Sequence, residues 1–373
     1  MRAQVEIIRS WQEFGKLQEE WGRLFWAMDV KNPFLSWDWV HTWMEIYGQA
    51  YEPLIFVVKD RGHVIGIVPF YLDRQYQLGF SRNGTIRWLG DQFVSSEFLD
   101  ILTPDYQKYA VWWNVMNWLL ENDDVNWSFL FLDDMLDTDF SVQILKQIAK
   151  KLALGYHRSV KNILPVLFLP HSWEEWVDTH PNVQFLSMIR NRSRRLRKKH
   201  AIEIHLIESQ EEFDPAVEIF FDLHQKNWNS RGEPGSFATD EKREFYRRMG
   251  RLFLKNGWLQ FRFSYLEGRP ATSEFGVALD NVYYSLQSGY DPDLRKFNMG
   301  HFLFYEIVQA LIKNGIKRIE FLRGDEKYKF DWGAQKRYSV TQWIGNRNLN
   351  GLIYPIYKRQ KHFFKHLVQG VFS

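Results

Sequence analysis

The sequence contains no cysteine among its 373 residues. This absence excludes disulfides, a thiolate nucleophile and thiolate metal ligands, and it suits a reducing compartment. The first residues, Met1 to Glu6, lack the apolar core of a signal peptide, and no run of roughly 18 apolar residues follows. The net charge is only +3, which is too small to indicate a nucleic-acid partner. We therefore expect a cytoplasmic protein.

Aromatic and apolar residues are abundant instead. Aromatic residues make up 17% of the chain, with 17 tryptophans, and the hydrophobic fraction is 45%. Such a composition excludes a disordered chain, and the length is sufficient for two domains. Strand patterns and helix patterns alternate along the sequence, which predicts an α/β protein.

The two halves of the sequence share an order of predicted elements. Val5 to Phe14 and Ile202 to Phe213 each predict a strand that runs into a helix capping box, Ser10 with Glu13 and Ser209 with Glu212. A predicted hairpin follows in each half. The hairpin strands are Leu54 to Val58 with Val64 to Leu72, and Trp258 to Leu266 with Thr272 to Leu279. We interpret this as a weak internal repeat of one α/β unit.

Three prolines, Pro165, Pro170 and Pro181, interrupt the pattern between the halves. We therefore place the boundary around residues 162–182, and divide the chain into residues 1–165 and residues 166–373. A short helix is expected to start at Ser172, which has Glu175 three residues later.

The stretch from Gly289 to Trp332 carries the strongest functional pattern. A predicted strand, Val282 to Gln287, precedes it; a helix is expected after Gly300, and a second strand over Ile316 to Leu322. A helix N-terminus behind a glycine-containing loop presents unpaired N–H groups to an anion. An ordinary βαβ crossover is the alternative. Only the second half shows this loop followed by a helix and a charged strand end.

Charged residues crowd the end of that second strand. They comprise Arg323, Asp325, Glu326, Lys327 and Lys329. Charged side chains at the carboxyl ends of α/β strands commonly face a ligand. A structural cluster of salt bridges is the alternative.

These residues resemble a known family. Gly289-Tyr-Asp-Pro, a glycine before the helix, and Phe321-Leu-Arg-Gly-Asp-Glu-Lys-Tyr-Lys are similar to the CelD-type branch of the GNAT acyltransferase superfamily, which is associated with cellulose or exopolysaccharide biosynthesis. The resemblance extends from about Phe34 to Trp332. It implies tandem GNAT-like (acyl-CoA N-acyltransferase) domains with mixed sheets flanked by helices, of which the second is catalytic.

The resemblance also implies a donor, acetyl-CoA or another acyl-CoA, and a loop that binds its pyrophosphate. The corresponding residues here are Arg295, Lys296, Asn298, Gly300 and His301. The usual loop of the superfamily has further glycines. In this sequence Met299 stands where close approach of the backbone is wanted, so a solvated basic turn stays open as the alternative.

Several residues are candidates for acid–base chemistry. Asp325, Glu326 and Glu274 are possible general bases for the acceptor nucleophile, and Tyr290 is a candidate proton donor to the leaving group. Arg323 and Lys329 are candidates for binding a phosphate or carboxylate. The alternatives are an outward-facing strand residue for Glu274 and a packing residue for Tyr290.

A further set lies on a predicted helix. His224, Trp228, Arg231 and Gly232 resemble a family pattern, and His224 and Trp228 are one helical turn apart. They are candidates for an acceptor pocket, with core packing as the alternative. No histidine–carboxylate pair has zinc-ligand spacing supported by a third ligand, so we expect no metal.

Two basic segments remain. Residues 190–199 predict a helix with one apolar stripe and a cationic remainder, which suits a solvated face, a nucleic-acid contact or an anionic-lipid contact. Fem-type peptidyltransferases, distant tandem relatives that use aminoacyl-tRNA, have a similar helix, but also a coiled-coil arm that this sequence lacks. Ile353 to Phe372 alternates apolar and basic residues, which suits a docked helix or a membrane-surface contact.

The sequence therefore predicts N- or O-acyl transfer from acyl-CoA to a small or carbohydrate-linked acceptor, in exopolysaccharide or cellulose biosynthesis. Direct attack by the acceptor is expected because the chain has no cysteine. The rivals are a Fem-like aminoacyl-tRNA-dependent transferase and a non-catalytic scaffold or binding subunit in polysaccharide assembly.

Overall fold

The computed structural model describes residues 3–74 and 84–347. The chain divides into two compact units. The first unit extends to Asn162 and resumes at Tyr338, and the second comprises Ile163 to Arg337. The sequence-based division assigned residues 166–373 to the second domain. The structure differs because the strand that starts at residue 335 crosses back into the first unit, where it pairs with a strand of that unit's sheet.

The first unit contains a mixed sheet and helices on both of its faces. Its strands are β1 (Gln4–Ile8), β2 (Glu52–Asp60), β3 (His63–Asp73), β4 (Gly84–Trp88), β5 (Trp127–Leu136) and most of β12 (Gln335–Gly345). Its helices are α1 (Trp11–Gly15), α2 (Gln18–Ala27), α3 (Trp37–Ile46), α4 (Lys108–Glu121) and α5 (Phe140–Lys151), with short 3₁₀ turns η1 (Pro33–Leu35), η2 (Gly48–Ala50) and η3 (Asp105–Gln107).

Neighbouring residues of β3 show how this sheet is covered, because successive side chains point to opposite faces. The ring of Phe70 packs against Trp112 of α4, with the ring centroids 6.0 Å apart. The ring of Tyr71 packs against Trp43 of α3 at 5.5 Å. Helices α4 and α3 therefore cover opposite faces of the sheet, and both faces are apolar and aromatic.

The second unit repeats this plan. Its strands are the end of β6 (Gly155–Phe168), β7 (Ile202–Leu206), β8 (Leu259–Leu266), β9 (Arg269–Leu279), β10 (Val282–Tyr290) and β11 (Arg318–Glu320). Its helices are α6 (Trp173–Thr179), α7 (Val183–Lys199), α8 (Gln210–Asn229), α9 (Asp240–Lys255), α10 (Met299–Lys313) and α11 (Lys327–Asp331), with the 3₁₀ turn η4 (Pro292–Phe297).

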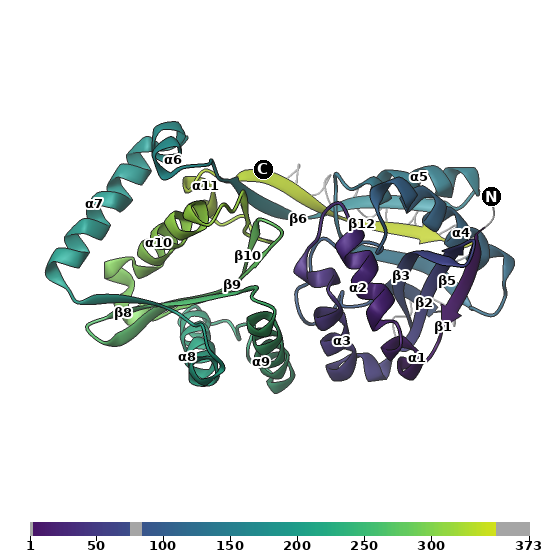
Figure 1. Ribbon diagram of the computed structural model, residues 1–373, viewed down its shortest axis with the longest axis horizontal. Coiled ribbons are helices and arrows are strands. Elements are labelled where there is room, and N and C mark those ends of the chain that lie inside the picture. Colours follow the sequence, from purple (N-terminus) through teal and green to yellow (C-terminus); the bar gives the residue numbers. More distant parts are fainter. Residues whose placement is uncertain (1–2, 75–83, 348–373) are drawn as a thin grey trace, which may run out of the picture. The chain divides into compact units, whose positions relative to one another are not determined.

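Helices again cover both faces of the sheet. Phe275 packs against Phe220 of α8 and Tyr246 of α9, with ring centroids 5.7 Å and 5.5 Å apart. The opposite face lies under α10, whose apolar residues pack against Tyr283 and Ile319 of the sheet. Figure 1 shows α7 and α10 on one side of this sheet and α8 and α9 on the other.

The strand order is the same in both units. It is β1-β2-β3-β4-β5-β12 in the first and β7-β8-β9-β10-β11-β6 in the second. In each unit the fourth and fifth strands are parallel and the other pairs are antiparallel. The last strand of each sheet comes from the other half of the chain, since β12 pairs with β5 and β6 pairs with β11. The predicted internal repeat is confirmed at the level of topology.

Most predicted elements are present, including the capped starts of α1, α6 and α8. The predicted strand Phe98 to Leu102 is wrong, because only an isolated bridge between Ile67 and Leu102 forms there. Of the three prolines, Pro170 and Pro181 lie between elements as expected, but Pro165 does not interrupt the chain. Pro165 lies within β6, where its carbonyl oxygen accepts a hydrogen bond from the Phe321 N–H at 3.1 Å. The basic segment from Ile353 onward lies outside the described residues.

Among the described residues, no helix combines the length and the apolar character needed to span a membrane.

Candidate functional site

The parallel strands β10 and β11 separate toward their carboxyl ends. They pair only from Val282 to Tyr284, whereas β10 remains paired with β9 as far as Tyr290, with a bulge between Ser285 and Gln287. The chain after β11 follows β6 instead, because the Gly324 N–H donates to the Ile163 carbonyl at 3.1 Å. Ligands of open α/β sheets bind where strands part at their carboxyl ends, so this is the first candidate position.

The loop between β10 and α10 lies at the same end. It forms the turn η4, and Asn298 then adopts a left-handed conformation with φ of 53° before α10 begins. The Asn298 side chain makes no N-capping hydrogen bond to α10. An uncapped helix N-terminus leaves N–H groups available to an anion. Arg295, Lys296 and Gly300 are exposed beside them. The predicted donor-binding residues are thus brought together, with one exception.

The exception is His301. Its Nδ1 atom accepts a hydrogen bond from the Trp332 indole at 3.2 Å, and its ring packs against Phe185 at 5.6 Å. Burial lowers the pKa of His301, so a neutral, packed imidazole results. Met299 is likewise turned into the core, where its side chain is 3% exposed. The Met299 side chain therefore does not cover the outer surface of the loop. It does not block the close approach of a ligand to the backbone, as its position in the sequence had suggested.

Tyr290 at the end of β10 connects this loop to α8. Its hydroxyl oxygen accepts hydrogen bonds from Arg231 and Arg295, each at 3.2 Å. Burial opposes ionisation of the phenol, but these two guanidinium groups outweigh it and lower the pKa of Tyr290. Arg231 also lies 5.8 Å from the ring of Trp228. Arg231, Trp228, Tyr290 and Arg295 thus form one basic and aromatic group.

Glu274 is the buried carboxylate of the site. It lies on β9 on the same face as Ser285 of β10, whose hydroxyl donates to it. Burial raises the pKa of Glu274 to about 7, while the Ser285 hydrogen bond and the positive charges of Lys329 and Arg262 oppose this rise. A carboxylate that titrates near neutral pH is suited to general-base chemistry. The alternative of an outward-facing strand residue does not hold for Glu274, which is 7% exposed.

The remaining predicted charges lie in the segment after β11. Asp325 is exposed, and Glu326 is exposed and pairs with Lys329 at 2.8 Å. Lys329 itself is buried, and its ammonium donates to the carbonyl oxygen of Arg323 at 3.1 Å. Lys329 therefore fixes the turn from Arg323 to Glu326, as the salt-bridge alternative anticipated for this residue.

His224 lies on the other side of the sheet from Glu274. It is fully buried on α8, and its Nε2 atom is 3.3 Å from the Gln287 side-chain oxygen. The bulge after Ser285 turns Gln287 to this face, opposite Phe275. Burial lowers the pKa of His224 to about 4, so the ring is neutral. Its ring contacts Trp228 at 5.8 Å, as the helical spacing predicted.

The sequence analysis did not identify Arg262. This residue lies directly opposite Glu274 in the register of β8 and β9. The Arg262 side chain is buried, and its Nη1 atom has no hydrogen-bond partner among the described residues. The register of the predicted hairpin was the available signal, since it places Arg262 directly opposite Glu274.

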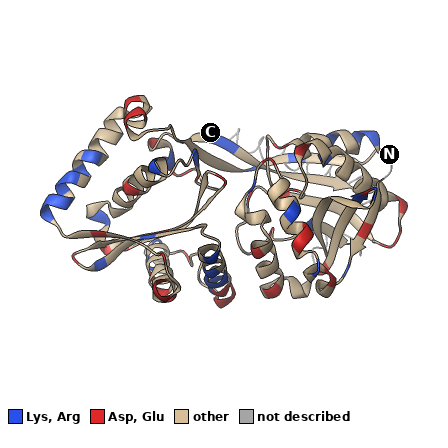
Figure 2. Ribbon diagram, viewed as in Figure 1, with Lys and Arg blue, Asp and Glu red and all other residues tan. Residues whose placement is uncertain are grey.

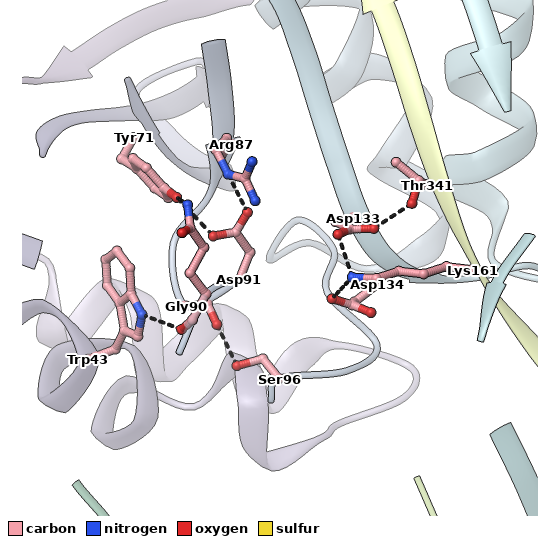
Figure 3. Close-up of polar contacts among 11 residues, drawn as sticks. Trp43, Tyr71, Arg87, Gly90, Asp91, Ser96, Asp133, Asp134, Lys161 and Thr341 are labelled. Atoms are coloured by element: carbon pink, nitrogen blue, oxygen red, sulfur yellow. Dashed lines mark hydrogen bonds and ion pairs between the residues drawn. The ribbon is translucent and has the colours of Figure 1, made fainter. Parts of the chain in front are cut away.

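The first unit has a corresponding strand, loop, helix and strand, contrary to the expectation that only the second half does. Figure 3 shows that its strand ends are occupied by internal ion pairs. Asp91, buried after β4, accepts from Arg87 at 2.8 Å and from the Tyr71 hydroxyl at 2.9 Å. Burial raises the pKa of Asp91 to about 7. Near the end of β5, Asp133 and Asp134 pair with Lys161 of β6.

In the described part of the chain, no group of three or more histidine or carboxylate side chains is placed to hold a metal ion.

Comparisons with known proteins agree with this geometry. Residues 184–330 match the family model described as an acetyltransferase (GNAT) domain. This match covers β10, α10 and β11 together with every predicted site residue. No curated protein shows significant sequence similarity to the chain.

Solved structures extend the likeness to both units. FemX superposes with a TM-score of 0.63 at 11% identity, covering 91% of this chain and 98% of its own. A protein of unknown function from Bacteroides thetaiotaomicron has a TM-score of 0.57 at 11% identity, with coverages of 92% and 100%. The C-terminal domain of a putative lysylphosphatidylglycerol synthetase from Agrobacterium fabrum has a TM-score of 0.53 at 9% identity. That alignment covers 89% of this chain and 92% of the other. These likenesses establish a mixed α/β fold over both units, as predicted. The second unit contains the segment that matches the GNAT domain model, and the first unit repeats its strand order.

Proposed function

We propose that the second unit is an acyltransferase that moves an acyl group from acyl-CoA to an amine or hydroxyl of a small or carbohydrate-linked acceptor. One observation carries this proposal: β10 and β11 part beside a cationic loop at the uncapped N-terminus of α10, within the segment that matches the acetyltransferase (GNAT) model. A helix N-terminus with nearby arginine and lysine suits the pyrophosphate of a coenzyme A donor.

The chemistry requires a proton acceptor and a proton donor. The acceptor nitrogen or oxygen attacks the thioester carbonyl and loses its proton, and the carbon–sulfur bond then breaks. We assign to Glu274, rather than to Asp325, the role of the base that takes the proton from the attacking nitrogen or oxygen. The pKa of Glu274, about 7, lets this carboxylate act as a base near neutral pH. Asp325 and Glu326 are exposed, and they stay weaker candidates.

Tyr290 is the proposed donor of a proton to the departing thiolate. Its oxygen accepts two hydrogen bonds from Arg231 and Arg295, so the hydroxyl proton is available for transfer. The same two guanidinium groups lower its pKa. Because Arg231 shares this contact with Arg295, we place Arg231 on the donor side rather than with the acceptor. Arg323 after β11 remains for the acceptor. Trp228 stays with Arg231, 5.8 Å from its ring. His224 is packed on Phe237 on the opposite face of the sheet from Glu274, which favours core packing for this residue.

The Fem-like rival has one observation in its favour. Helix α7 exposes a row of cations along its length, as Figure 2 shows; they are Arg190, Arg194, Arg195, Arg197, Lys198 and Lys199. Of these, Arg197 pairs with Glu306 at 2.9 Å. A phosphate backbone is an evident partner for such a surface. An aminoacyl-tRNA would then replace acyl-CoA as the donor, and FemX is among the structures of the same fold.

Calorimetry with the full chain separates these proposals. We expect acetyl-CoA or a longer acyl-CoA to bind, and Arg295→Glu to weaken that binding without unfolding the protein. The matched control is Lys255→Glu, an equal charge change at the far end of α9. Binding of aminoacyl-tRNA that falls steeply with salt, in the absence of acyl-CoA binding, would support the Fem-like donor. Binding of neither donor would leave the non-catalytic scaffold as the better proposal.

The wider context is also a proposal. The resemblance of the Gly289 to Lys329 motifs to the CelD-type branch supports a role in exopolysaccharide or cellulose biosynthesis, on the cytoplasmic side of the membrane. Activity toward nucleotide-linked or lipid-linked sugars, measured by acyl incorporation, tests that role directly.

A further inference from the structure

Helix α7 carries more positive charge along its exposed side than its neighbours compensate. Its residues, 183–199, include no aspartate or glutamate. Arg197 pairs with Glu306 of α10 at 2.9 Å, but within the described part of the chain the other exposed cations of α7 form no ion pair. They are Arg190, Arg194, Arg195, Lys198 and Lys199. Figure 2 shows the acidic residues of α6 beyond the N-terminal end of α7, and cations along the rest of the helix.

The exposed side of α7 also carries large apolar side chains. Val183 is 59% exposed and Met188 is 50% exposed. Residues seven positions apart lie on the same side of a helix, so Val183 shares its side with Arg190, and Met188 shares its side with Arg195. The opposite side of α7 packs into the core of the second unit. Helix α7 therefore presents aliphatic and cationic side chains together to the solvent.

This combination fits an anionic lipid surface better than a nucleic acid. Lipid headgroups attract arginine and lysine, and exposed aliphatic side chains can enter the boundary between headgroups and acyl chains. A nucleic acid offers phosphates to the same cations, but its bases stack on aromatic side chains. The single aromatic residue of α7, Phe185, is turned inward, where its ring packs on Trp332 at 5.2 Å. On a phosphate backbone Val183 and Met188 would gain nothing.

We propose that α7 docks the second unit on an anionic membrane surface, with Arg194 and Arg195 against phospholipid headgroups and Met188 at their boundary with the acyl chains. This inference goes beyond the proposed acyl transfer and does not depend on it. Arg192 connects α7 to the loop before α10, because its Nη2 atom donates to the Lys296 carbonyl oxygen at 3.0 Å. Docking of α7 therefore brings that loop close to the headgroups.

Co-sedimentation of the full chain with lipid vesicles tests the proposal. Vesicles of phosphatidylcholine alone are compared with vesicles of equimolar phosphatidylcholine and phosphatidylglycerol. We expect binding to the anionic vesicles and little binding to the neutral ones. The affinity for the anionic vesicles should fall as salt rises, because salt screens exposed charges. Equal binding to both kinds of vesicle, or binding to neither, overturns the proposal.

A pair of double variants tests whether α7 is the docking surface. Arg194→Gln combined with Arg195→Gln should lower the affinity for anionic vesicles roughly 20–30-fold, since each cation near such a surface contributes about fivefold. The matched control is Lys226→Gln combined with Lys255→Gln. It removes the same charge from exposed positions of α8 and α9, on the other side of the sheet (Figure 1), and should leave the affinity nearly unchanged. Equal losses in both double variants would indicate general charge attraction and overturn the proposal. Circular dichroism confirms that each variant is folded.

Met188→Gln separates a lipid from a nucleic acid as the partner, because it leaves the charge of α7 unchanged. Vesicle affinity should fall several-fold through the lost insertion of an apolar side chain, and tRNA affinity, measured at the same salt, should not change. If tRNA binds more tightly than anionic vesicles and Met188→Gln alters neither affinity, the partner is a nucleic acid and the proposal is overturned. Acyl-CoA binding is measured in parallel. A protein that docks on vesicles through α7 but binds no acyl-CoA refutes the proposed function alone.

Discussion

The parallel strand pairs of the two units, β4 with β5 and β10 with β11, end in opposite ways. In the first unit the helix that follows, α4, begins with Lys108, whose ammonium is 2.6 Å from Asp100 and 2.9 Å from both Asp105 and Asp139. In the second, α10 begins beside the exposed Arg295 and Lys296, and the side chain of its N-cap residue, Asn298, makes no capping hydrogen bond. The same topology thus supports a site filled by its own carboxylates and a site with cations still available.

A similar contrast separates two buried carboxylates. Burial raises the pKa of both Asp91 and Glu274 to about 7. Asp91 forms a direct ion pair with Arg87 and also accepts a hydrogen bond from the Tyr71 hydroxyl. Its negative charge is therefore compensated by a residue of the first unit. Glu274 accepts from the neutral Ser285, while Arg262 and Lys329 act on it as charges. A shifted pKa alone does not mark a catalytic group; the partners decide which carboxylate is available for proton transfer.

The largest effect is expected from Glu274→Gln. If Glu274 is the base, turnover should fall by roughly 10²–10⁴ while the fold and acyl-CoA binding persist. In the unmodified protein, kcat/KM should decline as pH falls below about 7, because Glu274 becomes protonated there. The variant should lose this limb of the profile.

The pH dependence of folding stability is an independent test of the raised pKa of Glu274. A folded pKa above the unfolded value makes stability fall as pH rises from about 4.5 to about 7, and Glu274→Gln should flatten that decline. Asp325→Asn is the comparison variant; if it reduces turnover and Glu274→Gln does not, the base is Asp325.

Lys108→Met should have the next largest effect, and on stability alone. Removing the ammonium leaves the buried Asp100 without its cation, and the half-buried Asp139 also loses its partner, at a cost of roughly 3–5 kcal/mol in the free energy of unfolding. Chemical denaturation followed by circular dichroism measures it. Acyl-CoA affinity should not change, because the first unit is not the proposed donor site. Reduced affinity in a protein that is still folded would contradict the contrast between the units.

Arg295→Glu is expected to weaken acyl-CoA binding by roughly tenfold or more, through the loss of a charge-assisted contact to phosphate. Its effect on thermal stability should be small, because Arg295 is exposed. Calorimetric titration measures the affinity for acyl-CoA. Rising salt should reduce the difference in this affinity between the variant and the unmodified protein. Equal affinities at low salt would remove the α10 loop from the donor site.

The smallest effects compare the repeated capping serines. Ser209 forms a complete capping box with Glu212, whereas the Ser10 side chain accepts only from the Glu13 N–H. Both Ser209→Ala and Ser10→Ala should cost about 1 kcal/mol, with the larger loss at Ser209 because Glu212 then loses its reciprocal partner. Thermal denaturation of the two variants tests the order, and a larger loss at Ser10 would contradict it.

Local pattern was sufficient for much of the fold. The helix starts at Ser10, Ser172 and Ser209 and the hairpins of both halves follow from short-range rules, since caps and strand alternation depend on near neighbours. The repeat was visible for the same reason. The strand predicted at residues 98–102 failed because its backbone hydrogen bonds go largely to other partners, such as the bond from the Leu99 N–H to the Asp134 carbonyl.

The candidate site was only partly predictable. Arg295, Lys296, Asn298 and Gly300 could be placed because they follow one another along a single loop. The pairing of Tyr290 with Arg231, and of Glu274 with Ser285, depends on strand register and on where α8 lies.

The sequence by itself determined the class of the fold, the two repeated units and the loop that offers cations at a helix N-terminus. Tertiary structure alone decided which strands close each sheet, because β12 and β6 are exchanged between the halves. It also decided that the charged side chains at the ends of β4 and β5 pair with one another, whereas the cations beside the ends of β10 and β11 remain exposed. The physical reason is that charge compensation depends on distances between elements, and these distances exist only after the strands have paired.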